Sequence, residues 1–513
     1  KLETLLVSGQ RNLQNEKVLS SLKLPERNAT LKKYLLKNLR IGNNNLTSLD
    51  LTNYTELETL FLYETLIGGT LDLSNKNKLK SLSLANSKIT ELKLPKNSLT
   101  SIDTKGSQIS ELDLSYNPGL TTISIGSKIL QTLNLSNVSS LTSTTLTNIV
   151  KSVPNITSLS LGNNKSLTKV SIGNFDNLKS VTIHTSTEDN DNINSININN
   201  NPKLTNIILG KLNNLTTLIL NDNGLTSING ILYLKNLTEL DLSNNKISSL
   251  NVSGLTSLKT LKVSNYSEGY DAALKNITLP KNTNKGEYLL ETLSIGNNLI
   301  TGKLDLTNYK NLKKLYVYSS KIKELELPHT RTLNTLSTAG SQIEKLNLSY
   351  NPGLTTITIN SKVLQELDLS NITSLNKDTL TNIVKSVPNI TNLSLGNNKS
   401  LTGISLTNSE SNSKLEKITI HTSSKDENDN LIRITIISYP SLKTITLGRL
   451  KKLKGLGLSN NSLTTIWNLN KKDENGEYLP SITNINLNNN SMKSLDVSNL
   501  TSLEELYISE QRD

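Results

Sequence analysis

A short motif, Leu-x-x-Leu-x-Leu-x-x-Asn, recurs along the whole chain and leaves it few possible folds. It reads LTELDLSNN from Leu237 to Asn245 and ITSLSLGNN from Ile156 to Asn164. The alternation inside Leu-x-Leu has the period of a β-strand. Because this strand pattern returns every ten or eleven residues, we expect coils of about 21 residues, each with two short strands and two turns.

A single coil of this kind cannot bury its own apolar face, so its neighbours must cover it. The pattern therefore predicts a repeat solenoid, predominantly β, with two parallel sheets whose Leu, Ile and Val side chains point inward. The Asn at the last motif position is expected to form hydrogen bonds with the buried backbone of its own turn. These residues are Asn117, Asn164, Asn245, Asn298, Asn351 and Asn398.

The composition agrees with a core of aliphatic side chains. Hydrophobic residues make up 35% of the 513 residues, yet the chain has only 2 Phe, 1 Trp and 1 Met. Because cysteine is absent, disulfides, thiol nucleophiles and thiolate metal sites are excluded. The formal net charge is +12, but the basic residues are spread along the chain with few aromatics, so we expect no nucleic-acid binding. No apolar run has the length of a membrane span.

Two similar segments depart from the strand pattern. STTLTNIVKSVPN, from Ser143 to Asn155, and KDTLTNIVKSVPN, from Lys377 to Asn389, place Leu, Ile and Val at helical spacing and end near a proline. We expect each segment to form a short helix on the outer face of the solenoid. Two interpretations of this helix stand side by side, a packing insert and an element that binds a partner.

A longer period lies above the coil. ELDLSYNPGLTTISI, from Glu111, reappears as KLNLSYNPGLTTITI from Lys345. We therefore predict one continuous solenoid with a first leucine-rich cassette (1–257), a second, homologous cassette (258–502) and the start of a further cassette (503–513). LETLLVSGQRN near the beginning and LEELYISEQRD at the end are versions of one sequence. We expect a segment of a longer array, a subunit that joins others in line, or a trimmed fragment.

The motif, the coil length and the helices that end near proline resemble the leucine-rich-repeat superfamily. More narrowly, they are similar to the repeats of Bacteroidetes and internalin-like bacterial surface proteins. The resemblance implies a right-handed solenoid with occasional short helices, which acts as an interaction module without cofactor or catalysis. It also implies an extracellular or cell-surface location. The first residues, KLETLLVSG, are already repeat sequence, so we expect no signal peptide in the chain.

The candidate binding residues are aromatic. Phe61 and Tyr63 in LFLYE, and Tyr316 and Tyr318 in LYVYS, are predicted to lie at outward positions of a strand, in matching places of the two cassettes. Outward aromatic rings provide contact area at low entropic cost. The alternative is that these rings pack against the Lys stems of a neighbouring coil.

Two acidic loops are the candidate metal sites. Asp189 and Asp191 in the first cassette, and Asp426 and Asp429 in the second, bring oxygen ligands that could bind calcium. The alternative interpretation of these loops is a solvated turn, because they lack the Gly and the distal Glu of a calcium-binding helix-loop-helix motif. Apart from calcium, we expect no cofactor.

Catalytic constellations are not recognisable in the sequence. The histidines His184 and His421 are equivalent residues of the two cassettes, on the order of 50 Å apart in a stack of strands, so they cannot share a metal or a triad. No Gly-x-Ser-x-Gly motif with a nearby His appears. We therefore predict that the chain is not an enzyme. A polysaccharide-cleaving solenoid would need two carboxylates that face each other in a groove.

Two functions remain open from the sequence. The first is a non-enzymatic, exported surface protein that offers an extended binding or adhesion surface to protein or glycan partners. The second is a self-assembling filament or sheath component, built of tandem cassettes, that binds copies of itself end to end or laterally. Electron microscopy of the protein would separate them.

Overall fold

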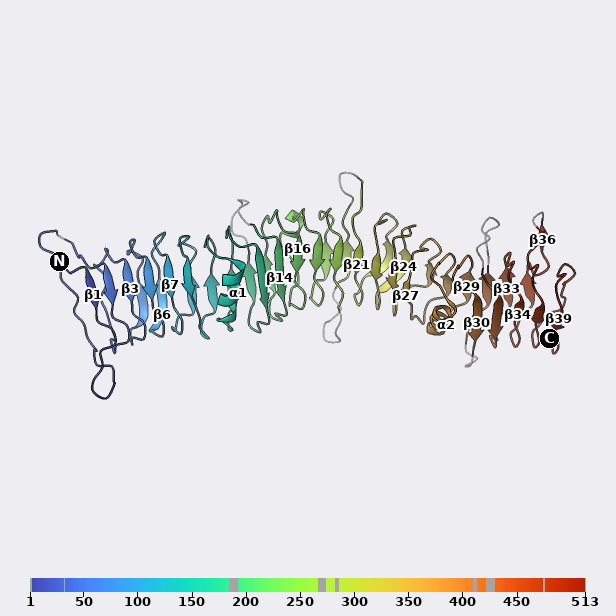
Figure 1. The fold of residues 1–513 in the computed structure, drawn as a ribbon, viewed down its shortest axis with the longest axis horizontal. Coiled ribbons are helices and arrows are strands. Elements are labelled where there is room, and N and C mark those ends of the chain that lie inside the picture. Colours follow the sequence, from blue (N-terminus) through green and yellow to red (C-terminus); the bar gives the residue numbers. More distant parts are fainter. Residues whose placement is uncertain are drawn as a thin grey trace. The chain divides into compact units, whose positions relative to one another are not determined.

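The computed structural model describes residues 2–31, 33–183, 192–265, 274–281, 286–408, 413–420, 430–473 and 476–512. The chain forms two compact units, a first unit of residues 1–258 with 278–280 and a second unit of residues 259–277 with 281–513. In each unit short strands lie side by side and pair in parallel, apart from a short antiparallel pair in the second unit (Figure 1). The solenoid predicted from the repeats is thus confirmed within each unit.

The short strands follow from the Leu-x-Leu pattern. In β3 (Thr59–Phe61) the central Leu60 is buried, while the residues on either side point outward and stay partly exposed. The leucines of successive coils lie opposite one another, since Leu60 is in register with Leu39 and with Leu82. Leucines stacked in this way form a continuous aliphatic core, with neighbouring strands roughly 4.8 Å apart.

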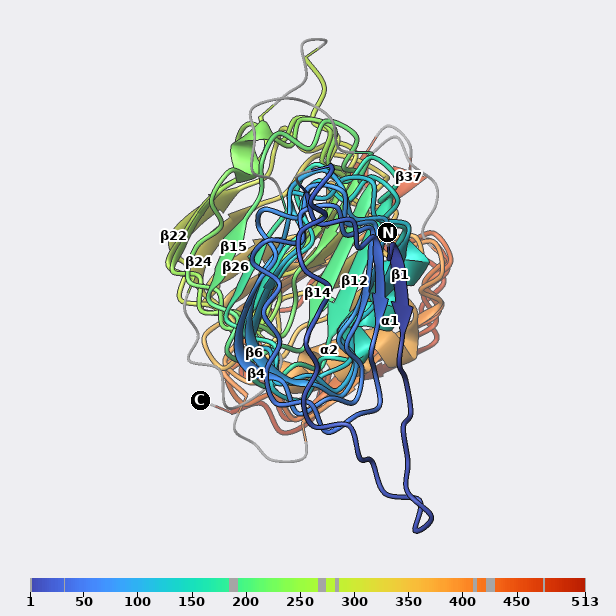
Figure 2. The same cartoon turned by 90° about the vertical axis from the view of Figure 1, so that its left-hand side faces the viewer.

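The strands of the first unit form two layers, and Figure 2 shows β4 and β6 apart from β1, β12 and β14. The first layer contains β1 (Thr4–Leu6), β2 (Asn38–Arg40), β3, β5 (Ser81–Ser83), β7 (Ser101–Asp103), β9 (Thr122–Ser124), β12 (Lys169–Gly173), β14 (Ser195–Asn199), β16 (Thr217–Ile219) and β17 (Glu239–Asp241). The second layer contains β4 (Gly68–Asp72), β6 (Lys88–Lys93), β8 (Glu111–Asp113), β10 (Thr132–Asn134), β11 (Ser158–Ser160), β13 (Ser180–Thr182), β15 (Asn206–Ile208) and β18 (Ser249–Asn251).

The second unit repeats this alternation. Its first layer contains β19 (Thr260–Lys262), β21 (Thr292–Ser294), β23 (Lys314–Tyr316), β25 (Thr335–Ser337), β27 (Thr356–Thr358), β30 (Gly403–Thr407), β32 (Arg433–Ile437), β34 (Gly455–Gly457), β38 (Asn484–Asn486) and β39 (Glu505–Tyr507). The second layer contains β22 (Thr301–Asp305), β24 (Lys321–Glu326), β26 (Lys345–Asn347), β28 (Glu366–Asp368), β29 (Asn392–Leu395), β31 (Lys417–Ile420), β33 (Thr444–Leu447) and β35 (Thr465–Trp467). The remaining elements are β20 (Asn276–Thr278), β36 (Lys472–Asp473), β37 (Gly476–Glu477) and the short 3₁₀ helix η1 (Ile231–Tyr233).

Both predicted helices form, but they do not lie on the outer face. α1 (Ser143–Lys151) follows β10 and precedes β11, so it takes the place of a first-layer strand between β9 and β12. The side chain of Thr142 caps its first turn, and Leu146 is fully buried. The backbone N–H of Ser127 donates to the carbonyl of Ser152, which ties the end of the helix to the preceding coil. α2 (Lys377–Ser386) occupies the corresponding place in the second unit.

The helix can replace a strand because its apolar face also packs on the aliphatic core. A helix that buries Leu, Ile and Val on one face covers the aliphatic core as an inward-pointing strand would. It cannot continue the strand ladder, however, and the first layer of each unit is therefore divided into two sheets at the helix. In the first unit the division falls between β9 and β12, and in the second between β27 and β30.

Buried asparagines link each turn to the coil before it. Nδ2 of Asn164 donates to the carbonyl of Leu161 in its own turn at 2.6 Å and to that of Leu135 in the preceding coil at 3.0 Å. Asn245 and Asn298 make equivalent pairs of bonds. The predicted bond to the residue's own turn is confirmed at these positions, and the bond to the neighbouring coil adds a contact between coils.

The side chains of the other three asparagines form their hydrogen bonds outside their own turn. Nδ2 of Asn117 donates to the carbonyl of Pro95, and that of Asn351 donates to the carbonyl of Pro328. Oδ1 of Asn398 accepts from the backbone N–H of a residue in the preceding coil. The expectation of a bond within the same turn is wrong at these positions. In the sequence SYNPG a tyrosine precedes Asn117 and Asn351, whereas the SNN and GNN turns have an asparagine with a positive φ at that place.

Candidate binding grooves

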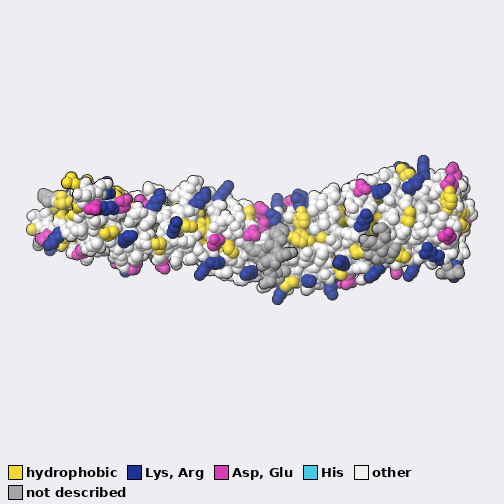
Figure 3. All heavy atoms as spheres, turned by 90° about the horizontal axis from the view of Figure 1, so that it is seen from below, with side chains coloured by type: hydrophobic (Ala, Val, Ile, Leu, Met, Phe, Trp, Pro, Cys, Tyr) yellow, Lys and Arg dark blue, Asp and Glu magenta, His cyan; other side chains and the backbone are white. Residues whose placement is uncertain are grey.

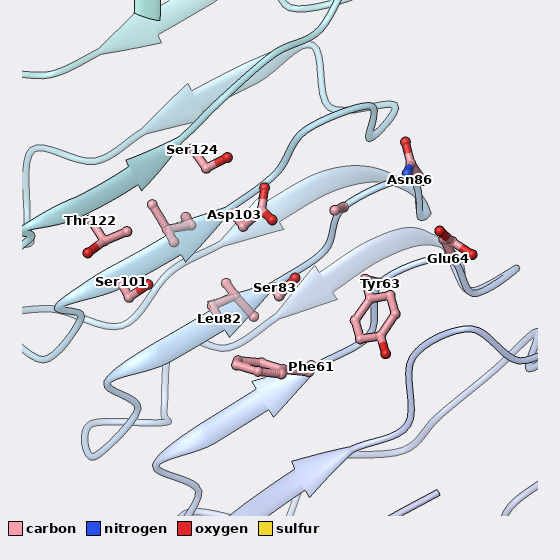
Figure 4. A pocket seen from close by; sticks show the side chains of 12 residues that line it. Phe61, Tyr63, Glu64, Leu82, Ser83, Asn86, Ser101, Asp103, Thr122 and Ser124 are labelled. Atoms are coloured by element: carbon pink, nitrogen blue, oxygen red, sulfur yellow. The ribbon is translucent and has the colours of Figure 1, made fainter. Parts of the chain in front are cut away.

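A groove of about 480 Å³ lies on the first layer of the first unit (Figure 4). Phe61 and Tyr63 stand at one side, and the next strands along the stack carry small or polar side chains. The groove is lined by Phe61, Tyr63, Glu64, Leu82, Ser83, Ala85, Asn86, Ser101, Ile102, Asp103, Thr122 and Ser124. The groove forms because the next coil carries small side chains beside the two rings, with Ser83 next to Phe61 and Ala85 next to Tyr63.

Strand register fixes the order of the side chains in this groove. Phe61 on β3 pairs in register with Ser83 on β5, Ser83 pairs with Asp103 on β7, and Asp103 pairs with Ser124 on β9. These side chains therefore form one outward row that crosses four coils. On the other side of the ring, the guanidinium of Arg40 lies 4.7 Å from the centre of Phe61 and holds it by a cation–π contact.

Tyr63 is positioned by a glycine in the preceding coil. Its ring lies so close to Gly42 that an added Cβ there would be 2.4 Å from two ring carbons. Tyr318 in the second unit rests in the same way on Gly296, where an added Cβ would be 2.6 Å from the ring. Three of these rings thus pack against the preceding coil, Phe61 on Arg40, Tyr63 on Gly42 and Tyr318 on Gly296.

The groove contains two carboxylates with different surroundings. Glu64 forms an ion pair with Lys17, whose Nζ lies 3.3 Å from its carboxylate. Oδ1 of Asp103 accepts a hydrogen bond from the backbone N–H of Lys105 at 3.2 Å. Within the described part of the chain, no cationic side chain lies within 4.0 Å of the Asp103 carboxylate.

The second unit has a related groove of about 560 Å³. Tyr318 lines it as Tyr63 lines the first, and Ser337, Ala339, Asn360 and Lys362 lie among the other lining residues. Tyr316 lies on β23, in register with Ser337, but it is not among the residues that line the groove. The structure thus brings Phe61 together with Tyr63 in one groove, and places Tyr318 alone in the other.

The sequence pattern did not point to Asp103, Ser83 or Gly42. It predicted which residues face outward, but the groove depends on what the next two coils carry in the same rows. An alignment of successive coils reveals the groove, because Ser83 and Asp103 occupy the position of Phe61 in the next two coils. The glycine that precedes each aromatic by one coil, in RIGNN and SIGNN, was a further signal.

The calcium candidates Asp189, Asp191, Asp426 and Asp429 lie outside the described residues. Among the residues that the structure describes, no group of three or more His, Asp or Glu side chains is arranged to hold a metal ion. His329 is described, and it stacks on Tyr350 with 3.9 Å between the ring centres. The prediction about calcium therefore stays a prediction.

Charged side chains do not gather into one patch on the face shown in Figure 3, where Lys and Arg are interspersed with Asp and Glu. Cations often lie beside carboxylates of neighbouring coils, as Lys37 lies 2.7 Å from Glu3 and Lys345 lies 2.7 Å from Glu366. No helix within the described ranges has both the length and the apolar character needed to cross a membrane.

Comparison with known proteins finds matches among solved structures only; no family model and no curated protein matches the chain. The functional domain of InlJ from Listeria monocytogenes is 21% identical, with a TM-score of 0.34 over 80% of this chain and 69% of that one. YopM from Yersinia enterocolitica is 19% identical, with a TM-score of 0.26 over 99% and 91%. The plant peptide hormone receptor RGFR1, solved in complex with RGF2, is 18% identical, with a TM-score of 0.25 over 99% and 97%.

The chain's own repeat and coil define its fold. The Leu-x-x-Leu-x-Leu-x-x-Asn motif recurs throughout the sequence, and its central leucines stack in register from coil to coil. Its buried asparagines bind the backbone of the turns, and parallel strands form the layers of both units. The chain therefore has the fold of a leucine-rich-repeat solenoid.

Proposed function

We propose that this chain is a non-enzymatic binding protein that is exported, acts at the cell surface, and recognises a polypeptide partner in its grooves. Leucine-rich-repeat proteins act in protein binding or recognition. The rigid stack of coils holds outward side chains at fixed spacing, which lowers the entropy lost when a partner binds. The composition, free of cysteine, is compatible with export.

The observation that carries this proposal is the groove beside Phe61 and Tyr63. An aromatic wall next to small, partly exposed side chains offers apolar contact and room for a partner's side chain. The second unit has a groove in the corresponding place, with Tyr318 as its aromatic residue. Hydroxyl and amide groups of Ser101, Asn86 and Thr122 border the first groove and can bind the amides of an extended main chain.

A displayed library of random 12-residue peptides, selected on the purified full chain, tests this proposal. We expect selected peptides that lose binding when Phe61→Ser and Tyr63→Ser are combined. The matched control is Tyr116→Ser, because Tyr116 is an exposed aromatic residue outside the groove. A chain that retains no peptide, or peptides that bind the double variant as well as the natural chain, would contradict the proposal.

Self-association is the second candidate function. It is supported by exposed apolar side chains outside the grooves, such as Leu13, Trp467 and Tyr507. Copies of the chain that bury these residues against one another would form dimers or filaments. Negative-stain electron microscopy across a range of concentrations tests this candidate, and separate particles at every concentration would remove it.

A further inference from the structure

We propose that the groove of the first unit selects a lysine or arginine side chain of an extended polypeptide. This inference rests on the proposed function and names the chemistry of the partner. The aliphatic stem of the bound residue lies against Phe61 over Ser83, and its charged end meets the carboxylate of Asp103. Phe61, Ser83 and Asp103 are consecutive members of one outward row.

The dimensions of the row suit a basic side chain. Strands of a sheet are about 4.8 Å apart, so Asp103 lies roughly 10 Å from Phe61 across two strand spacings. The serine between them leaves the space above the sheet open, and it forms part of the groove. An extended lysine side chain is about 6 Å long by its bond lengths, so a lysine seated over Ser83 reaches Asp103 while its stem contacts the ring.

The charges around the groove favour a cation at Asp103. Glu64 is already paired with Lys17, whereas the Asp103 carboxylate has no such partner among the described side chains. Lys105, in the turn that follows β7, lies against Gly126, since an added Cβ at that glycine would be 3.2 Å from Cγ of Lys105. Its stem therefore extends towards the next coil.

Arg40 contacts the ring of Phe61, and it lies across Phe61 from Asp103. Its strand, β2, is on the opposite side of β3 from β5 and β7. Three strand spacings separate the strands of Arg40 and Asp103, which is about 14 Å. Solvent screens exposed charges at this distance, so Arg40 does not oppose a cation bound at Asp103.

The second unit supplies an internal comparison. Tyr316 pairs with Ser337, and Ser337 pairs with Thr358, so Thr358 stands two strands from the ring, as Asp103 stands two strands from Phe61 in the first unit. The second groove keeps its tyrosine but has no carboxylate among its lining residues, and it contains Lys362. We therefore expect the selection for a basic residue in the first groove alone.

The test compares peptide selections on the natural chain and on Asp103→Asn. The amide oxygen of asparagine can still accept the bond from the Lys105 backbone, so the fold is retained. We expect Lys and Arg to be enriched at one peptide position with the natural chain and not with Asp103→Asn. Replacing that basic residue by Gln weakens binding to the natural chain about tenfold, and leaves binding to Asp103→Asn almost unchanged.

A gain of selection provides the second arm. Thr358→Asp places a carboxylate two strands from Tyr316 in the same outward row, and in a chain that also carries Asp103→Asn it restores enrichment of basic peptides. Peptides that depend on Phe61 and Tyr63 but show no basic preference overturn this inference and leave the proposed function standing. Retention of no peptide at all defeats the proposed function itself. Spermidine that binds as tightly as the peptides, with the same dependence on Asp103, shows recognition of a free amine and overturns the polypeptide partner.

Discussion

At the scale of single residues, one buried asparagine side chain can form hydrogen bonds with several buried backbone groups. Asn245 donates to the carbonyls of Leu220 and Leu242 at 2.8 and 3.0 Å, and it accepts from the backbone N–H of Leu225 at 3.1 Å. One side chain therefore satisfies three backbone groups that are closed to water. Backbone polar groups left unpaired in a buried place each cost on the order of 1–3 kcal/mol.

Asn245→Ala is expected to lower the free energy of unfolding by about 2–4 kcal/mol, because it leaves all of these backbone groups without their hydrogen-bond partner. The measurement is denaturant-induced unfolding followed by circular dichroism. Asn236→Ala is the matched control, since Asn236 is exposed and its amide donates to the carbonyl of Asn213 at 2.7 Å. Equal losses for the two variants would show that burial of the amide is not what matters.

Lys76 occupies a place that other coils fill with apolar side chains. It is 1% exposed, and its Nζ lies 3.3 Å from the carbonyl of Thr52. The equivalent turns carry Tyr54, Tyr309 and Val138, all buried. We expect Lys76→Leu to raise the free energy of unfolding by about 1–3 kcal/mol, because it removes a buried cation from an aliphatic site.

Lys78→Leu is the control for this change. Lys78 is exposed and pairs with Glu56 at 2.8 Å, so the same substitution there removes an exposed ion pair and buries nothing. It should leave stability nearly unchanged or lower it slightly. If Lys76→Leu lowers the denaturation midpoint, the contacts of Lys76 contribute more free energy of stabilisation than the desolvation of its charge costs.

The difference between Lys76→Leu and the natural chain should depend on pH. Burial lowers the pKa of Lys76 below its ordinary 10.5, so the folded state holds this proton less firmly than the unfolded state does. The free-energy cost of burying the charged lysine is complete at pH values below the pKa of the folded state. It decreases as the pH rises towards 10.5. Burial raises the pKa of Tyr309 to about 12, so the stability it contributes is lost only above pH 10, equally in both proteins.

We therefore expect the stabilisation by Lys76→Leu to shrink between neutral pH and pH 10.5. Unfolding curves of the two proteins, recorded at half-unit steps over this range, measure it. A constant difference across the range would indicate that Lys76 is not deprotonated in the folded state at these pH values.

At the scale of elements, rows of exposed ion pairs connect successive coils, and their signs differ between the units. Just before the first-layer strands, the first unit places Glu3, Lys37 and Glu58 in one row, with 2.7 Å between Glu3 and Lys37. The equivalent row of the second unit reads Lys259, Glu291 and Lys313. There Glu291 lies 3.9 Å from Lys259 and 2.6 Å from Lys313. Opposite charge is thus preserved between neighbouring coils while every sign is reversed.

Glu291→Lys puts three cations in consecutive coils. We expect it to lower the free energy of unfolding by about 1 kcal/mol at low salt, and by less at 1 M salt, because exposed charges are screened. Reversing all three residues, with Lys259→Glu and Lys313→Glu added, recreates the order of the first unit and should restore most of the loss. Failure of the triple variant to recover would show that Glu291 acts through contacts other than charge.

The strands, the helices and the residues that face inward or outward could be predicted from the sequence, because the spacing of apolar residues in the repeat indicates them. The outward position of Phe61 and the buried positions of the leucines follow from strand period, and the helices follow from a change of that period. The place of α1 inside the stack could not be predicted, since its apolar face fits an outer insert as well as a strand's place. The same limit applied to Asp103 and Lys76, whose surroundings depend on the neighbouring coils and not on the residues beside them in the chain.

At the scale of the whole molecule, each coil is stabilised by the coils on either side. Leu315 on β23, fully buried, is in register with Leu293 on β21 and Leu336 on β25. In such an array stability is close to a sum of coil terms and nearest-neighbour contacts. A loss at one coil should therefore be felt over a few coils and fade with distance along the chain.

Leu315→Ala is expected to cost about 2–5 kcal/mol locally, by removing buried methyl groups and leaving a cavity. Hydrogen exchange followed by mass spectrometry should show faster exchange in β21, β23 and β25, with β3 and β5 of the first unit unchanged. Leu60→Ala, at the equivalent place of the first unit, should produce the converse pattern. If either substitution accelerates exchange equally in both units, the chain opens as one cooperative body, and the nearest-neighbour description of its stability is wrong.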